Sequence, residues 1–404
     1  MRLGYFPLFL LIASVLGVCV LPDRALGAEP VQASPGKARF VVRTDPSWDA
    51  FTALPDDTRK MWFRDYVWRM MVYSPYFDSR LAWYPNAWIY INLYSIPVNS
   101  VVVKQHPDWV LRDAHGQRLY IPYECRGGSC PQYAADVSNP AYRQAWLEKA
   151  AGFKRKGYKG FWIDDVNLAF RVSDGNGDFQ APVVGGKAMT EADWSGNVVT
   201  FLEQIRSAFP DTEILHNAIW FSGGEQRDKN PLVQRQLRAC DYVNVERGVT
   251  DSGLKGGDGE WSLNALLSYI DRVHQLGKGV VLDNTGDDYS YGLAGFYLIS
   301  SGADALGSHR LRPDQWPSSL GTDLGAPLGK RHEWKGLLVR EFSGGVVLLN
   351  PPGRTRRQVT LSSGPLHNAD SPLGQEIQLS SPGGVVLSGT FAGRSSLEKM
   401  IHVQ

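Results

Sequence analysis

Residues Gly160 to Asn167 read GFWIDDVN, an apolar run that ends in two adjacent acids, Asp164 and Asp165. A buried parallel strand is normally apolar throughout, so paired carboxylates at its end need a reason. In a (β/α)8 barrel the carboxyl ends of the eight strands surround the substrate, and acids at those ends are typical of catalysis. The stretch therefore predicts a barrel strand with chemistry at its end.

The chain around this stretch alternates short apolar runs with longer helical stretches, as parallel strands covered by helices do. We expect a helix over residues 55–71, the second strand at residues 88–94, and the third strand ending at Asp136. The other expected strands are residues 39–44, 160–164, 213–218, 241–246, 279–284 and 303–308. A doubly wound sheet is the alternative, but it seldom carries eight units or polar residues at so many strand ends. The predicted fold is α/β, a (β/α)8 TIM barrel.

The two ends of the chain differ from its centre. Residues 1–28 begin with a basic residue, continue with an apolar run and end in small residues, which is the layout of a secretory signal peptide. Residues 29–37 read as a linker and residues 38–320 as the barrel. Residues 334–404 read as a small C-terminal antiparallel β-sandwich domain. We expect an exported protein, secreted or periplasmic, with no stable membrane span after cleavage, because the apolar run is shorter than a typical span.

The composition favours an ordinary globular protein. Of 404 residues, 43% are hydrophobic and 21% charged, and the formal net charge of +1 argues against a nucleic-acid partner. In an oxidising compartment Cys125 and Cys130 are expected to form a disulfide, which leaves Cys240 unpaired. A metal site is the alternative, but no further Cys or His stands at ligand spacing beside them.

One loop has a superficial likeness to a calcium site. Asp174, Asn176 and Asp178 alternate as calcium ligands do, but Val183 and Val184 fall where acidic ligands should follow. We therefore interpret the segment as a plain loop. No HExxH motif indicates zinc, and we expect neither a metal nor a cofactor.

Polar residues at the predicted strand ends are expected to share one rim. Two carboxylates across a sugar-sized cleft are what glycoside hydrolysis requires, one as nucleophile or base and one as proton donor. The sequence contains no GxSxG motif, which argues against hydrolysis by a serine nucleophile. We predict Asp164 and Glu246 as the catalytic pair and a carbohydrate as the substrate. The predicted substrate-binding residues are Asn92, Tyr94, Asp136, Asp165, His216, Asn217, Trp220 and Asp283.

Several of these residues have a structural alternative. Only one of Asp164 and Asp165 can face the barrel axis, because neighbouring strand residues point to opposite sides; the other could cap the next helix. Asp136 could cap the helix that starts at Pro140. Asp283 could pair with Arg310 or Arg247, and Glu246 with Arg247. Trp109 and Trp162 join Trp220 and Tyr94 as candidates for stacking on sugars, although Trp162 could be packed inside the barrel.

GFWIDDVN resembles the fourth-strand motif of glycoside hydrolase barrels related to α-amylases, α-galactosidases and polygalactosaminidases. HPDWVLRDAHG (106–116) and DVSNPAYRQAW (136–146) resemble stretches in poorly characterised bacterial members of that superfamily. The resemblance implies that Asp164 is the nucleophile and Asp165 its neighbour. In α-amylases the acid/base follows the fifth strand, where this chain has Asn217, so the resemblance points to Glu246 after the sixth strand instead.

The leading hypothesis is an exported glycoside hydrolase of a polysaccharide or oligosaccharide. It would retain anomeric configuration if the two carboxyls are about 5 Å apart and invert it at about 6.5 to 9.5 Å. The alternative is a catalytically inactive barrel that binds carbohydrate during polysaccharide export or assembly. An exported barrel enzyme that cleaves another kind of bond also fits, since a fold does not determine chemistry. The oligomeric state is left open.

Overall fold

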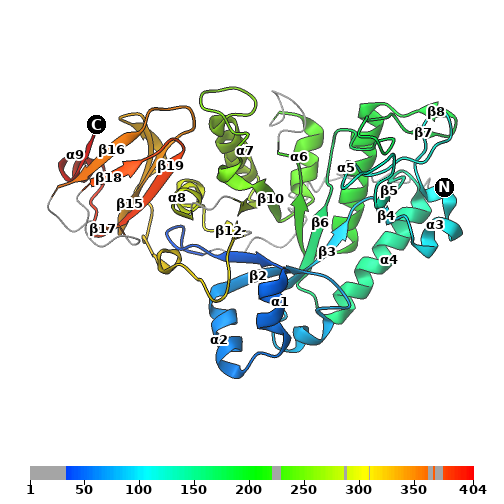
Figure 1. Ribbon diagram of the computed structural model, residues 1–404, viewed down its shortest axis with the longest axis horizontal. Coiled ribbons are helices and arrows are strands. Elements are labelled where there is room, and N and C mark those ends of the chain that lie inside the picture. Colours follow the sequence, from blue (N-terminus) through cyan, green and yellow to red (C-terminus); the bar gives the residue numbers. More distant parts are fainter. Residues whose placement is uncertain (1–32, 221–228, 286–288, 309, 363–366, 369–375) are drawn as a thin grey trace, which may run out of the picture.

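Eight parallel strands close into a barrel with neighbours in the order β1-β12-β11-β10-β9-β6-β3-β2 (Figure 1). The computed structural model describes residues 33–220, 229–285, 289–308, 310–362, 367–368 and 376–404; the expected signal peptide lies outside them. The strands are β1 (Phe40–Arg43), β2 (Val67–Val72), β3 (Ala87–Asn92), β6 (Gly160–Asp164), β9 (Glu213–Asn217), β10 (Tyr242–Arg247), β11 (Gly279–Asn284) and β12 (Ala305–Ser308). The predicted (β/α)8 barrel is confirmed.

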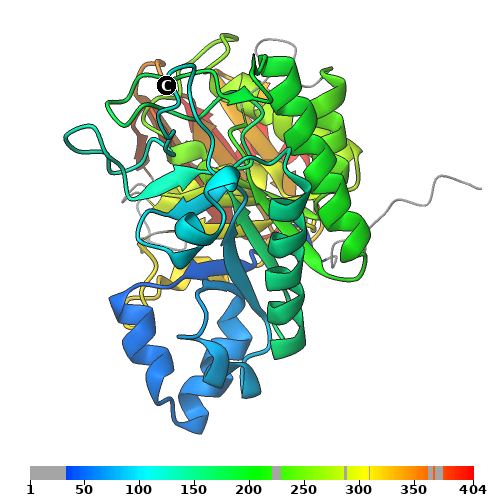
Figure 2. The ribbon, with the colours of Figure 1, turned by 90° about the vertical axis from the view of Figure 1, so that its right-hand side faces the viewer.

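Helices on the outside connect most successive strands. Figure 2 shows α4 and α5 running side by side along the barrel wall. Between β2 and β3 the connection holds only a short 3₁₀ turn, η1 (Asp78–Ala82). The outer helices are α1 (Pro46–Ala53), α2 (Asp57–Tyr66), α4 (Pro140–Lys156), α5 (Glu191–Ala208), α6 (Pro231–Arg238), α7 (Leu263–Gln275) and α8 (Tyr289–Ile299).

Local sequence explains where these helices begin and end. The Asn139 side chain accepts hydrogen bonds from the first turn of α4, Pro140 occupies its first position, and Gly157 ends it with a left-handed φ of 99°. Thr190 and Asp193 form a reciprocal capping box at the start of α5. These caps hold the helices that carry the chain back to the next strand.

Two strand predictions were wrong, but one missed strand and one extra strand leave the number of barrel strands unchanged. The expected helix over residues 55–71 ends at Tyr66, and its last part is instead the second barrel strand, β2. The run expected as the third strand gives β5 (Gln132–Ala134), which pairs with β4 (Ser95–Pro97) outside the barrel. Residues 160–164 therefore remain the fourth barrel strand.

The barrel interior is a packed apolar layer. Each strand contributes one residue to it, and the rings of Trp88, Trp162 and Tyr242 fill the centre, with Trp88 and Trp162 centroids 6.1 Å apart. Trp162 is thus buried inside the barrel and is unavailable for stacking on a sugar. The layer consists of Val41, Met71, Trp88, Trp162, Leu215, Tyr242, Val281 and Ala305.

A buried ion pair lies below this layer, at the amino-terminal end of the barrel. Arg69 donates to Glu213 through Nε at 2.8 Å and Nη2 at 2.7 Å, and Trp88 Nε1 donates to the same carboxylate at 2.8 Å. Gly160 leaves room for Glu213, since a Cβ at Gly160 would lie 2.8 Å from the Glu213 Cβ. Acids at this end of a barrel are typical of a structural role.

Glu213→Ala is therefore expected to destabilise the fold by about 3 to 5 kcal/mol, because it leaves the buried Arg69 charge without a partner. Urea unfolding monitored by tryptophan fluorescence measures the change. The control is Glu203→Ala, which breaks a pair with Arg235 whose side chains are each 42% exposed and should cost less than about 1 kcal/mol. Equal losses in the two variants would contradict the role of burial.

The connection between β3 and α4 is a long excursion on the carboxyl-terminal side of the barrel. It contains α3 (Val101–Gln105), the turn η2 (Pro107–Trp109) and the β4–β5 pair. A disulfide joins Cys125 and Cys130 in it. Cys240 is free and buried, and burial raises the pKa of its thiol to about 12.

The chain ends in a β-rich unit that packs on α8 (Figure 1). A Cβ on Gly384 of β19 would lie 2.7 Å from the Ala294 Cβ of α8, so the two backbones approach closely. Arg340 Nη1 of β14 donates to the carbonyls of Tyr297 at 3.0 Å and Ser300 at 2.8 Å. The predicted antiparallel C-terminal sandwich is confirmed, with an unexpected helix, α9 (Arg394–Met400).

The elements of this unit form two antiparallel sheets around their own apolar core. The first sheet has the order β13-β14-β15-β19-β17 and the second β18-β16-β20. Their strands are β13 (His332–Trp334), β14 (Leu337–Phe342), β15 (Gly345–Asn350), β16 (Arg357–Leu361), β17 (His367–Asn368), β18 (Glu376–Leu379), β19 (Gly383–Ser388) and β20 (Ile401–Val403).

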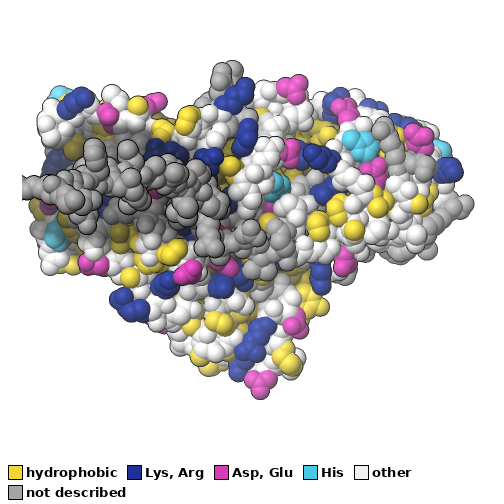
Figure 3. All heavy atoms as spheres, turned by 180° about the vertical axis from the view of Figure 1, so that it is seen from behind, with side chains coloured by type: hydrophobic (Ala, Val, Ile, Leu, Met, Phe, Trp, Pro, Cys, Tyr) yellow, Lys and Arg dark blue, Asp and Glu magenta, His cyan; other side chains and the backbone are white. Residues whose placement is uncertain are grey.

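The surface carries both signs of charge. On the face shown in Figure 3, Lys and Arg side chains are interspersed with Asp and Glu, in line with the formal net charge of +1. Within the described part of the chain, no helix combines the length and apolarity needed to cross a membrane.

Candidate active site

A polar layer lies on top of the apolar layer, at the carboxyl-terminal mouth of the barrel. Side chains two positions apart on a strand face the same side. The residue two positions after each member of the apolar layer therefore also points toward the barrel axis. All of these inward positions but one carry a polar group. They are Arg43, Tyr73, Tyr90, Asp164, Asn217, Asn244, Asp283 and Gly307.

Asp164 faces the axis of the barrel, two residues after Trp162 of the apolar layer. Its Oδ2 accepts from the Tyr90 hydroxyl at 2.6 Å, and its Oδ1 accepts from Asn217 Nδ2 and from the backbone N–H of Asp165, both at 2.8 Å. Burial, and then the charge of Asp164, raises the pKa of Tyr90, so the phenol keeps its proton and donates it. Three donors thus fix the orientation of the Asp164 carboxylate.

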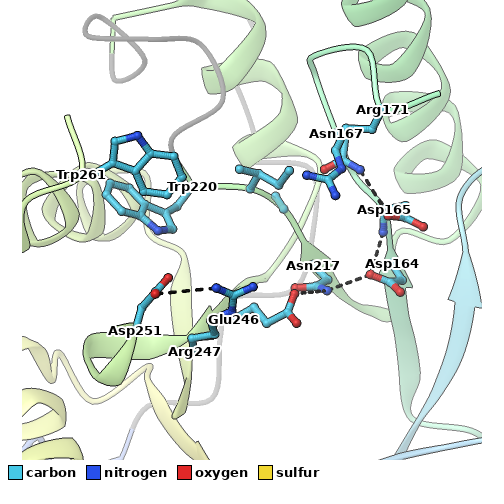
Figure 4. Close-up of a pocket in the computed structure, with 12 residues that line it drawn as sticks. Asp164, Asp165, Asn167, Arg171, Asn217, Trp220, Glu246, Arg247, Asp251 and Trp261 are labelled. Carbon is cyan, nitrogen blue, oxygen red and sulfur yellow. Dashed lines mark hydrogen bonds and ion pairs between the residues drawn. The ribbon is translucent and has the colours of Figure 1, made fainter. Parts of the chain in front are cut away.

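Asn217 connects Asp164 to Glu246. Its Nδ2 lies 2.8 Å from Asp164 Oδ1 and 3.5 Å from Glu246 Oε2 (Figure 4). Its Oδ1 accepts from Asn244 Nδ2 at 2.9 Å. The two carboxylate oxygens can be no farther apart than these two distances end to end, about 6.3 Å. The predicted catalytic carboxylates, from β6 and β10, are therefore close together at the barrel mouth.

Asp165 lies beside this pair but has a different environment. Its Oδ2 accepts from Asn92 Nδ2 at 2.5 Å and its Oδ1 from Asn167 Nδ2 at 3.3 Å. Burial, and then the charge of Asp164, raises the pKa of Asp165 to about 6. It does not cap a helix, since the next helix begins at Glu191.

The backbone at Asp165 is also strained. Its φ of 55° is in the left-handed region, which costs a residue other than glycine about 1 to 3 kcal/mol. Such strain is typically retained at functional sites, where the surrounding structure holds it. Here it turns the chain sharply after β6, so that Asp164 and Asp165 both reach the pocket.

The pocket is open to solvent and has a volume of about 740 Å³. Figure 4 shows Trp220 and Trp261 on the side of Glu246 away from Asp164, with ring centroids 6.2 Å apart. Arg247 lies on the same side and pairs with Asp251 at 3.7 Å. The lining residues are Asp164, Asp165, Asn167, Arg171, Asn217, Ala218, Ile219, Trp220, Glu246, Arg247, Asp251 and Trp261. Acids, amides and aromatic rings in one hollow suit a carbohydrate.

Asp283 faces the barrel mouth but does not line the pocket. It forms an ion pair with Arg43 of β1, a partner that was not considered from the sequence. Gly307 lies between them on β12, where a Cβ would come within 3.0 Å of Asp283 Oδ1. The Arg43 guanidinium also lies over the Trp162 ring, 5.5 Å from its centroid. Asp283 thus orders one side of the polar layer.

Three predicted binding residues lie away from the pocket. His216 points outward into the helical layer, because Leu215 before it faces the barrel axis, and burial lowers its pKa to about 3. Tyr94 is fully buried and packs on Trp194 at 5.2 Å. Asp136 lies outside the barrel, where its Oδ1 accepts from the backbone N–H of Ser138 at 2.8 Å.

Two further interpretations from the sequence were wrong in detail. The cap of α4 is Asn139, not Asp136. Trp109 is buried against Tyr142 and stacks on His106 at 3.9 Å, so it cannot stack on a sugar. Asn92 does not line the pocket itself, but it donates a hydrogen bond to Asp165, which does.

Several residues of the barrel mouth were not predicted from the sequence. Tyr90, Asn244 and Arg43 lie inside or at the end of predicted strands, and counting two positions from each buried layer residue would have found them. Trp261 and Arg171 come from loops, whose paths leave no such pattern.

Solved structures similar to the chain include the trehalose-6-phosphate hydrolase of Bacillus licheniformis, at 10% identity and a TM-score of 0.49, over 88% of this chain and 100% of that one. A maltogenic α-amylase of Thermotoga neapolitana matches at 11% and 0.49, over 88% and 99%. The glycoside hydrolase domain of PelA from Pseudomonas aeruginosa matches at 11% and 0.41, over 68% and 94%. The curated proteins gave no match.

Membership of a family rests on a match to the sequence itself. The model described as "Hypothetical glycosyl hydrolase family 15" matches residues 69–346, well over half of the chain. This range runs from β2 to the start of β15 and includes Asp164, Asn217 and Glu246. The chain therefore belongs to hypothetical glycosyl hydrolase family 15 and is a TIM-barrel glycoside hydrolase.

Proposed function

We propose that the chain hydrolyses glycosidic bonds of a polysaccharide or oligosaccharide, with Asp164 as the nucleophile and Glu246 as the acid/base. One observation carries the proposal: the amide of Asn217 connects the two carboxylates at the edge of one pocket, with their nearest oxygens at most about 6.3 Å apart. Glycoside hydrolysis needs such a pair flanking the scissile bond.

The surroundings of the two acids support different roles. Asp164 is held by three donors, so the direction of its carboxylate is fixed, as suits a group that attacks the anomeric carbon. Glu246 is exposed and touches only the Asn217 amide among the hydrogen bonds found for it in the described chain. It is free to protonate the leaving oxygen and later to take a proton from water.

The separation of the acids supports retention of configuration. An inverting enzyme leaves about 6.5 to 9.5 Å between its carboxyls to admit a water molecule, whereas a retaining one brings them to about 5 to 5.5 Å. Asp164 and Glu246 are both within hydrogen-bonding reach of one amide nitrogen, Asn217 Nδ2, which favours the closer, retaining arrangement. Asp164 would thus form a covalent glycosyl intermediate that water hydrolyses in a second step.

The remaining pocket residues would bind and orient the sugar. We propose that Trp220, which is buried against Trp261, supports the pocket wall and that Asp165 and Asn217 contact hydroxyl groups of the sugar, since all three line the pocket. Asn92 and Asp283 would act indirectly, through Asp165 and Arg43 respectively. Residues 38–320 would form the catalytic unit, and residues 334–404 a β domain that supports it.

Export is part of the proposal. The layout of residues 1–28 supports cleavage after Ala28, and the Cys125–Cys130 disulfide supports an oxidising compartment. The protein recovered from the periplasm or medium is expected to begin at Glu29. An N-terminal sequence beginning at Met1 would contradict export by this route.

The test of the proposed function is reducing-end release from starch, pectin, galactan, alginate and chitosan, which cover neutral, acidic and basic polymers. The expected result is release of reducing ends from at least one polymer. The first product seen by NMR should have the same anomeric configuration as the bond that was cleaved. Binding without release from any polymer would contradict hydrolysis. Release with the opposite anomer would contradict the nucleophilic role of Asp164 and leave hydrolysis standing.

A further inference from the structure

Exposed aromatic side chains lie on opposite sides of the barrel mouth. In the closed order of eight strands, β2 is diametrically opposite β10. Tyr73 directly follows β2, and Trp261 lies in the connection after β10. Both are among the exposed large side chains, at 44% for Tyr73 and 40% for Trp261. Between them lie the carboxylates of Asp164 and Glu246.

Contacts tie Tyr73 to the catalytic face. It is two residues after Met71 of the apolar layer, so its side chain is directed to the mouth. Its ring lies 5.1 Å from the ring of Tyr90, whose hydroxyl donates to Asp164. Tyr73 is thus connected to Asp164 through Tyr90, and it is not among the residues that line the pocket.

Trp261 extends the pocket on the other side. Its ring meets that of the buried Trp220 edge to face, with centroids 6.2 Å apart at 75°. Trp220 is in turn 6.4 Å from Tyr269 of α7, so the pair rests on a packed helix. A rigid, partly exposed ring is suited to stacking on a sugar, because it loses little conformational entropy on binding.

We propose, building on the proposed function, that a glycan chain binds across the barrel mouth, with one sugar ring on Tyr73 on one side of the carboxylates and another on Trp261 on the other side. A chain held on both sides of Asp164 and Glu246 is cut at an internal bond. The substrate is then a polymer or long oligosaccharide, and the cleavage is endo-acting.

The test uses the full chain and whichever of starch, pectin, galactan, alginate or chitosan it hydrolyses, together with fragments of that polymer two to eight residues long. Early products are expected to span intermediate sizes, with a fast fall in viscosity per reducing end formed. Tyr73→Ala and Trp261→Ala should each raise KM for the polymer about tenfold. Their loss in kcat/KM should be larger for octasaccharides than for disaccharides.

Two further variants separate stacking from folding. Tyr66→Ala is the matched control, because Tyr66 is 42% exposed and stacks on Trp62 but precedes β2 at the opposite end of the strand; its KM should change less than about twofold. Tyr73→Phe keeps the ring and should restore the KM that Tyr73→Ala loses.

The outcomes distinguish the two proposals. Hydrolysis that yields only monosaccharides or disaccharides from the start, with KM unchanged in Tyr73→Ala, would overturn the binding mode across the mouth and leave the proposed function standing. No hydrolysis of any of the five polymers would overturn the proposed function and this inference with it.

Discussion

Asp164→Asn is expected to abolish hydrolysis, lowering kcat by roughly 10⁴-fold or more, since an amide cannot form the glycosyl intermediate. The variant should still fold, because Asn has nearly the same shape. Asp164 accepts from Tyr90, Asn217 and a backbone N–H, and one oxygen of Asn can keep only part of this set. A loss of about 1 to 3 kcal/mol in unfolding free energy is therefore expected.

The control for this variant is its neighbour. Asp165→Asn keeps a residue type that tolerates the left-handed backbone, and it changes a carboxylate held by Asn92 and Asn167. It should lower kcat by no more than about a hundredfold, as loss of a supporting contact typically does. Measuring kcat and urea unfolding for both variants decides which of the two acids is the nucleophile. Full loss in Asp165→Asn with activity kept in Asp164→Asn would reverse the assignment.

The fold was predictable where apolar runs are long and end in polar residues. Residues 160–164, 213–217 and 279–284 each have these features and are barrel strands. β2 was mistaken for the end of a helix because Arg69 interrupts its apolar run like the polar face of a helix. The structure shows that Arg69 points inward and is paired with Glu213, which is 144 residues later. Such a distant partner leaves no trace in the local sequence.

The site was predictable to the extent that it consists of acids at strand ends. Asp164 and Glu246 stand out because a carboxylate that ends an apolar run is unusual. His216 looked equally unusual, but the direction of its side chain depends on which neighbour faces the barrel axis, and here that is Leu215. The partner of Asp283 could not be predicted either, because Arg43 is 240 residues away and only closure of the barrel brings β1 within one strand of β11.

Glu246→Gln is expected to reduce kcat on the polymer by roughly 10²- to 10⁴-fold, the usual contribution of a general acid. The reason is that the leaving oxygen of a sugar must be protonated as the bond breaks. An aryl glycoside with a nitrated phenol as leaving group does not need this proton. On such a substrate the first step should be nearly as fast as in the wild type, so a glycosyl intermediate on Asp164 accumulates.

This dependence on the leaving group separates the two carboxylates, because Asp164→Asn should be inactive on both kinds of substrate. Azide should restore turnover of Glu246→Gln on the aryl glycoside, since it attacks the intermediate without a general base. Asp251→Asn is the control at the same pocket, as Asp251 pairs with Arg247 and faces neither carboxylate. Equal losses of kcat/KM, which reports the first step, on the polymer and the aryl glycoside in Glu246→Gln would exclude Glu246 as the proton donor, and the acid would then have to come from elsewhere on the rim.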